Sequence, residues 1–284
     1  MCIVYKVEEF RDNREIALFI GTLIQDSFRN SLLLGDLSAP MNKRSRAFKI
    51  SHGDNFHTGF TIFDGSDVPV IVFPHGMTEY WQTIRNFVDT LNYKEIMVIY
   101  PVELEDDTSI PTPPPWLGWD TYSWNLDFSD DALRFTKEEL EIMPLDENFP
   151  EIRAASLDDA EAIQEFFERE VTEDPSFGHW FLPEQLESEM SVIAEQDGVI
   201  VGFGGTHFET PYTVQLGNIY VKPEFRGMGL GRAITTAVTL GIIRTKRVPT
   251  LFVNESNEVA KKLYESLGFE RFNKFSFYRG IRVS

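Results

Sequence analysis

Cysteine is almost missing from this chain, since Cys2 is the only one among 284 residues. A single cysteine excludes a disulfide within the chain and leaves no cysteine cluster for zinc, which favours a reducing compartment. Long apolar runs are missing too, because none approaches the roughly 20 residues that cross a bilayer. The charged N-terminus lacks the pattern of a signal peptide. We therefore expect a cytoplasmic protein that does not bind a membrane.

Basic residues are scarce, with 26 Lys and Arg against 45 Asp and Glu and a net charge of −19. Nucleic-acid binding depends on cations that neutralise phosphates, so this charge argues against a nucleic-acid partner. The acidic excess serves solubility or attracts a cationic amine, and both alternatives stay open. The apolar content of 42% is nevertheless enough for a substantial core.

Two proline-rich segments interrupt the chain. Residues 110–115 contain four prolines, which indicates an extended connector. Residues 143–150 are polar and carry a proline near each end. We place a domain boundary in this second segment, which predicts one domain over residues 1–148 and another over residues 149–284.

Hydrophobic periodicity predicts the same order of elements in both halves: helix, antiparallel strands, helix, strand. Each half is therefore expected to be an α/β (α+β) domain with a mixed, mainly antiparallel central sheet flanked by helices. In the first half the predicted helices cover residues 15–29, 77–91 and 130–142, the last being acidic. In the second half Ser156 is the expected N-cap of a helix, and Gly268 the stop of another.

The most informative segment is a strand, a glycine-rich loop and a helix in succession. The strand ends before Pro223, three glycines follow at residues 227, 229 and 231, and the helix-prone run 233–243 begins. The first turn of a helix has unpaired N–H groups and a positive dipole end. Glycines let a ligand approach those groups, so the loop is a candidate site for a phosphate or pyrophosphate.

Three interpretations of this loop fit less well. A nucleoside-triphosphate loop ends in Gly-Lys-Ser/Thr, whereas Arg232 and Ala233 follow Gly231 here. A dinucleotide fold has GxGxxG directly after a strand of a parallel βαβ unit, whereas this loop has GxGxG after a meander. A helix start without a ligand would have no use for three glycines, which cost chain entropy.

The loop Arg226-Gly227-Met228-Gly229-Leu230-Gly231 resembles the Arg/Gln-x-x-Gly-x-Gly/Ala loop of the GNAT superfamily of acyl-CoA-dependent N-acyltransferases. Asn257-x-x-Ala260-x-x-x-Tyr264-x-x-x-Gly268-Phe269 resembles its second signature, so that the likeness covers residues 151–284. The run 30–37 loosely resembles an opening found in two-domain GNAT proteins. Residues 1–148 have no such glycine loop, which implies a degenerate GNAT-like first domain without a CoA site. Its role would be structural, or that of a wall of the acceptor pocket.

The resemblance implies acetyl-CoA as co-substrate, and no metal. Main-chain N–H groups of the loop would bind the CoA pyrophosphate, and the strand before it would part from its neighbour to pair with the pantetheine arm. Asn257 would contact that arm, or would only cap its helix. The expected cofactor-binding residues are Ile219, Tyr220, Val221, Arg226, Gly227, Met228, Gly229, Leu230, Gly231, Arg232 and Asn257.

The resemblance also suggests catalytic groups. Tyr264 matches the position from which many members protonate the departing thiolate, although it could instead only pack beside Phe269. Many members carry a Glu base on the strand before the loop, but residues 215–221 contain no acid. His207 and Glu209, on the preceding strand, are the candidate bases, directly or through water. His179, in an aromatic loop, is a further candidate.

The predicted function is an acetyl-CoA-dependent N-acetyltransferase that moves an acetyl group to a primary amine of a small molecule or amino acid by direct attack. The alternative is a non-enzymatic acyl-CoA-binding sensor or interaction module, which the missing strand carboxylate favours. The acceptor, the acyl length and the oligomeric state, with a homodimer as one option, stay open.

Overall fold

A computed structural model describes residues 5–24, 30–37, 44–64, 68–72, 80–102, 118–140, 149–170, 183 and 185–283. The chain divides into two compact units. The first unit holds Met1–Ala132 and Phe272–Ser284, and the second holds Leu133–Arg271. The connector at 110–115, His179 and the segment 143–148 lie outside the described residues.

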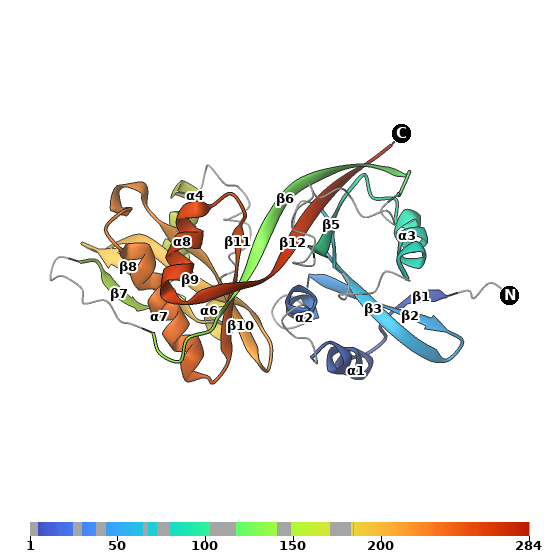
Figure 1. The fold of residues 1–284 in the computed structure, drawn as a ribbon, viewed down its shortest axis with the longest axis horizontal. Coiled ribbons are helices and arrows are strands. Elements are labelled where there is room, and N and C mark those ends of the chain that lie inside the picture. Colours follow the sequence, from blue (N-terminus) through green and yellow to red (C-terminus); the bar gives the residue numbers. More distant parts are fainter. Residues whose placement is uncertain are drawn as a thin grey trace. The chain divides into compact units, whose positions relative to one another are not determined.

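The first unit is a mixed sheet with helices (Figure 1). Its strand order is β1-β2-β3-β4-β5-β12-β6. The strands β4 and β5 pair in parallel, and the pairs β1–β2, β2–β3, β3–β4 and β5–β12 are antiparallel. The strands are β1 (Lys6–Glu9), β2 (Ser45–His52), β3 (Asn55–Phe63), β4 (Val70–Val72), β5 (Glu95–Val102), β6 (Tyr122–Phe135) and β12 (Phe269–Arg282), and the helices are α1 (Asn13–Leu23), α2 (Ser31–Leu37) and α3 (Trp81–Thr90).

The second unit repeats this plan, with the order β6-β11-β10-β9-β8-β7. Here β10 and β11 are the parallel pair, while β7, β8, β9 and β10 are antiparallel neighbours. The strands are β7 (Glu151–Ala154), β8 (Ser191–Gln196), β9 (Val199–Glu209), β10 (Thr213–Val221) and β11 (Val248–Asn254), and the α-helices are α4 (Ala160–Glu170), α6 (Gln185–Ser188), α7 (Leu230–Arg244) and α8 (Glu258–Leu267). The mixed, mainly antiparallel sheet expected of each half is confirmed.

Helices cover both faces of the second sheet. Ile234 and Val238 of α7 pack with apolar residues of β8, β9 and β10, including Leu216. On the other face Phe166 and Phe167 of α4 pack with Phe203 of β9. Since side chains alternate between the faces of a strand, these contacts fix which side of β9 and β10 each residue occupies.

Local signals set the ends of two helices as predicted. The Asp159 carboxylate accepts the Ser156 N–H at 2.8 Å at the start of the helical segment that leads into α4, and Arg153 anchors it from β7 at 2.7 Å. Gly268, with φ of 109°, ends α8 in the left-handed conformation that glycine adopts most easily.

The acidic helix predicted over residues 130–142 is wrong. The strand β6 runs through Phe135, and Asp131, Leu133 and Phe135 are buried along it. The alternation of apolar and polar residues that is typical of a strand cannot be recognised in this sequence, because the sheet buries acids such as Asp131. The compact units also divide the chain elsewhere than at 148/149, because β6 and β12 each contribute residues to both units.

Candidate active site

The glycine loop follows β10 in the second unit. A short 3-10 turn, Pro223–Phe225, stops the strand, as the proline predicts. Gly227 and Gly229 then have φ of 76° and 88°, in the left-handed region that side chains avoid. Gly229 is the N-cap of α7. The left-handed backbone at these two positions explains why glycine occupies them.

The loop presents a row of backbone amides. The Ala233 N–H donates to the Gly229 carbonyl at 3.0 Å and so makes the first helical bond of α7. Within the described part of the chain, the amides of residues 227–232 have no hydrogen-bond acceptor. The Arg226 amide, by contrast, already donates to Pro223 O at 3.2 Å. Six amides at a helix N-terminus without an acid in its first turn are suited to an anion.

The side chains of the two loop arginines contact neighbouring residues of the same unit. Arg226 donates from Nε to the Val221 carbonyl at 3.0 Å, and its guanidinium carbon lies 5.4 Å from the centre of the Tyr220 ring. Arg232 donates to the Ser266 hydroxyl of α8. The Arg226 guanidinium therefore connects the loop to the end of β10, and the Arg232 guanidinium connects α7 to α8.

The parallel strands β10 and β11 part just before the loop. Their pairing ends at Leu216 and Leu251, although β10 continues to Val221 and β11 to Asn254, and all these residues are described. At the same point β10 bulges against β9, where two residues, Asn218 and Ile219, stand opposite one. Asn218 takes the left-handed φ of 53° there. Residues 219–221 thus have no strand paired on their β11 side among the described residues, although the Val221 carbonyl accepts from Arg226 Nε.

Two predicted residues lie on α8. Asn257 is its N-cap, and its side-chain oxygen accepts the Ala260 N–H at 3.1 Å. Tyr264 is 8% exposed, with its ring centre 6.0 Å from that of Phe269, and no hydrogen bond from a described residue reaches its hydroxyl. Burial raises the pKa of Tyr264 to about 12, which keeps the phenol protonated and able to donate.

His207 lies beside the bulge of β10. A Cβ on Gly217 would come within 2.6 Å of its ring, so the imidazole rests directly on that glycine. The side chain hydrogen-bonds to Asn218. Burial lowers the pKa of His207 to about 4, against the opposing effect of this hydrogen bond, so the ring is neutral at pH 7 and weakly basic.

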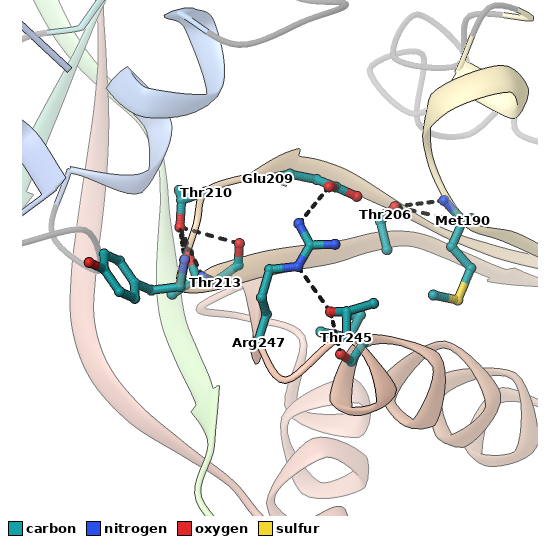
Figure 2. Close-up of polar contacts among 9 residues, drawn as sticks. Met190, Thr206, Glu209, Thr210, Thr213, Thr245 and Arg247 are labelled. Atoms are coloured by element: carbon teal, nitrogen blue, oxygen red, sulfur yellow. Dashed lines mark hydrogen bonds and ion pairs between the residues drawn. The ribbon is translucent and has the colours of Figure 1, made fainter. Parts of the chain in front are cut away.

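Glu209 occupies the other face of the sheet. It pairs in register with Val214, which packs against α7, and its carboxylate accepts from Arg247 Nη1 at 2.6 Å. Arg247 also donates from Nε to the Thr245 hydroxyl at 2.9 Å, just beyond α7 (Figure 2). An acid fixed in this ion pair and separated from His207 by the sheet is poorly placed to serve as a base.

Gln215 is an uncharged residue of β10 that sequence reasoning about acids does not single out. It is 7% exposed, and its carboxamide oxygen has no hydrogen-bond partner among the described residues. A buried orphan acceptor costs about 1–3 kcal/mol, so such a group calls for an explanation. In the sequence, the feature that could have singled out Gln215 is its position as a polar residue between Val214 and Leu216, which are both buried.

The family comparison matches residues 154–269 to the acetyltransferase (GNAT) family. The C-terminal half of the chain is a GNAT acetyltransferase domain. This range includes β9, the glycine loop, Asn257 and Tyr264. The predicted family is thereby confirmed for this half.

Two curated relatives share part of the GNAT domain. A mycothiol acetyltransferase of Thermomonospora curvata is 39% identical over 98 residues, which are 33% of this chain and 30% of that protein. One of Thermobispora bispora is 34% identical over 137 residues, or 43% of this chain and 46% of that protein. The match thus spans less than half of either relative.

A solved structure extends the likeness beyond the GNAT domain. A tandem GNAT protein from the clavulanic acid biosynthesis pathway superposes with a TM-score of 0.66 over 97% of this chain and 98% of its own, at 13% identity. At this identity the likeness is one of fold. It confirms two tandem GNAT-like domains.

The described residues contain no group of three or more His, Cys, Asp or Glu side chains arranged to hold a metal ion. Nor do they contain a helix long and apolar enough to cross a membrane.

Proposed function

We propose that this protein transfers the acetyl group of acetyl-CoA to a primary amine of a small molecule or amino acid. The observation that carries the proposal is the row of six unbonded amides at the start of α7, directly after the point where β10 leaves β11. The two curated relatives, both named acetyltransferases, support the same reaction class.

The residues around the loop fit CoA. A Cβ built on Gly227 would meet nothing within 4 Å, so the space beside the loop is open. The amides of residues 227–232 hold the pyrophosphate, and Ile219 and Tyr220, on the side that β11 leaves unpaired, hold the pantetheine arm. Acetyl-CoA would supply the activated thioester when bound. The Tyr264 hydroxyl holds the proton that the thiolate needs.

Calorimetric titration with acetyl-CoA tests this site. Gly229→Glu puts a side chain and a negative charge into the amide row, and we expect it to abolish binding. Gly198→Glu is the matched control, because Gly198 also has a positive φ of 78° and open space around it, in the turn between β8 and β9. Equal affinity of the two variants would contradict the proposed site.

The second candidate function is an acyl-CoA sensor without turnover. The observation in its favour is that Glu209, the only acid on β9, β10 and β11, is paired with Arg247. Thiol release from acetyl-CoA over a panel of amines separates the two. Tight binding with no release on any amine would replace the enzyme by the sensor, and failure to bind CoA would favour an interaction module.

A further inference from the structure

The sheet face opposite α7 is built from uncharged groups next to the point where β10 and β11 part. We call this surface the acceptor face and define it by Gln215, Gly217 and His207. Val214 and Leu216 point toward α7, so Gln215 and Gly217 point away from it. His207 joins them because its ring rests on Gly217.

Gln215 offers this face a hydrogen-bond acceptor. It stands opposite Thr250 in the pairing of β10 with β11, one residue before that pairing ends. Its buried carboxamide oxygen has no hydrogen-bond partner in the described part of the chain. Native proteins satisfy such atoms, so a donor from a ligand is the natural complement. An amine N–H is a donor of this kind.

Two glycines let neighbouring groups come close to the strands beside Gln215. Gly217 pairs in register with Gly205 of β9, and neither residue has a side chain. A Cβ on Gly205 would meet the Ser191 hydroxyl at 3.2 Å, and one on Gly217 would strike the His207 ring. Larger residues at both positions are therefore excluded, and the two glycines bring the Ser191 hydroxyl and the His207 ring close to the strands beside Gln215.

No charged residue of the described strands β9, β10 and β11 lies on this face. Glu209 is the only acid on β9, β10 and β11, and it is held by Arg247 on the side of α7. His207 is neutral and bonded to Asn218. A neutral surface of low polarity disfavours a cation, because burying a charge without a counter-charge is costly.

We propose that the acceptor face binds its amine in the uncharged form through Gln215, and so selects α-amines of the amino-acid type over alkylamines. This inference rests on the proposed acetyl transfer. The α-amino group has a pKa of about 7.7–8.0, against about 10.4 for a lysine-like alkylamine. At pH 7.5 about a third of the first and about 0.1% of the second are uncharged, a ratio of roughly 250.

Proton-linked calorimetry tests the inference without turnover. Alaninamide and isopropylamine are titrated into the protein saturated with CoA, at pH 7.5 in two buffers of different ionisation enthalpy. A face that takes the uncharged amine releases close to one proton per isopropylamine bound, and its apparent affinity is about 250-fold lower than that for alaninamide. Similar affinities without proton release would overturn the inference.

Substitutions at Gln215 sharpen the test. Gln215→Glu supplies a counter-charge, so we expect isopropylamine to bind at least 10-fold more tightly and with less proton release. Gln215→Met keeps the size of the side chain but cannot accept a hydrogen bond, and weakens both amines while CoA affinity stays unchanged. Gln164→Glu, exposed on α4, is the matched control and leaves both amines unaffected.

Glu189 provides the sharpest contrary outcome. This acid is buried just before β8. The N–H of the next residue, Met190, donates to the Thr206 hydroxyl at 3.0 Å. If Glu189→Gln removes the binding of isopropylamine and leaves that of alaninamide, a carboxylate holds the ammonium and the inference fails. Failure of the wild-type protein to bind acetyl-CoA would instead count against the proposed function, so the two failures are distinct.

Discussion

Arg226 closes the exit of β10 by donating from Nε to the carbonyl of Val221 at 3.0 Å. Its guanidinium also lies over the Tyr220 ring, with 5.4 Å between the guanidinium carbon and the ring centre. The side chain thereby joins the loop to the last two residues of the strand. At the proposed CoA site we therefore expect Arg226 to act through the geometry of that strand end more than through its charge.

Replacing Arg226 should therefore weaken CoA binding even when the charge is kept. We expect Arg226→Ala and Arg226→Lys both to lower the affinity for acetyl-CoA about 10-fold, since a charged hydrogen bond is worth about 1.5–3 kcal/mol. Calorimetry measures this. Arg244→Ala removes the same charge at the exposed end of α7 and should have no effect. A lysine variant with full affinity would show that charge alone matters.

Tyr264→Phe should separate turnover from binding. The phenol has no hydrogen bond to a described residue, so its loss costs little stability, while the proton donor disappears. We expect kcat to fall at least 10-fold with CoA affinity nearly unchanged. Tyr212→Phe, at an exposed position, is the control. Parallel losses of kcat and affinity would indicate that Tyr264 only packs.

Gly229 has a positive φ and Gly231 does not, so substitution by alanine should affect the stability of the protein differently at the two positions. Gly229→Ala forces a side chain into a left-handed residue and should lower the free energy of unfolding by about 1–2 kcal/mol. Gly231→Ala should be neutral or slightly stabilising, because its Cβ would meet Leu263 and Val221 at an ordinary 3.8 Å. Chemical denaturation of both variants compares them, and equal losses would contradict the assigned backbone.

His207 should make the protein less stable in mild acid. Its pKa is about 4 in the folded state against about 6.5 when unfolded, so the unfolded chain binds more protons between these values. The stability it contributes is complete above pH 6.5 and falls by up to about 3 kcal/mol as the pH drops to 4. Denaturation of His207→Gln should show a flatter pH dependence, whereas the exposed His52→Gln should keep the wild-type slope.

Asp36 should act in the opposite direction. It is buried on α2, its carboxylate accepts the Thr61 hydroxyl at 2.5 Å, and burial raises its pKa to about 7. The folded state then binds more protons, so stability falls by up to about 4 kcal/mol as the pH rises from about 4 to 7. Asp36→Asn should be more stable than the wild type at pH 8 but not at pH 4. The exposed Asp54→Asn is the control.

The sequence was sufficient where chemistry is local. Pro223 stops a strand, Gly229 begins a helix and Gly268 ends one because each imposes a backbone conformation on its own neighbourhood. These positions carry the family resemblance, so the strand, the glycine loop and the helix could be predicted before the fold was known.

The sequence was insufficient where a distant partner decides. Residues 130–135 form a strand because the sheet buries them, a tertiary effect that overrides their acidic, helix-like composition. The sequence also did not predict which side chains of β9 lie on which face of the sheet. A bulge places His207 and Phe208 opposite the single residue Gln215, so that Glu209 turns to the side of α7.

The strand β12 has a consequence for how the chain is made. It pairs with β5 from Lys274 opposite Val102 to Ile281 opposite Glu95, across more than 170 residues of sequence. During synthesis the sheet of the first unit therefore stays incomplete until residues 274–281 have been made, although strands β1 to β5 of the same unit are made much earlier. Completion of this sheet thus depends on a pairing between segments more than 170 residues apart in sequence.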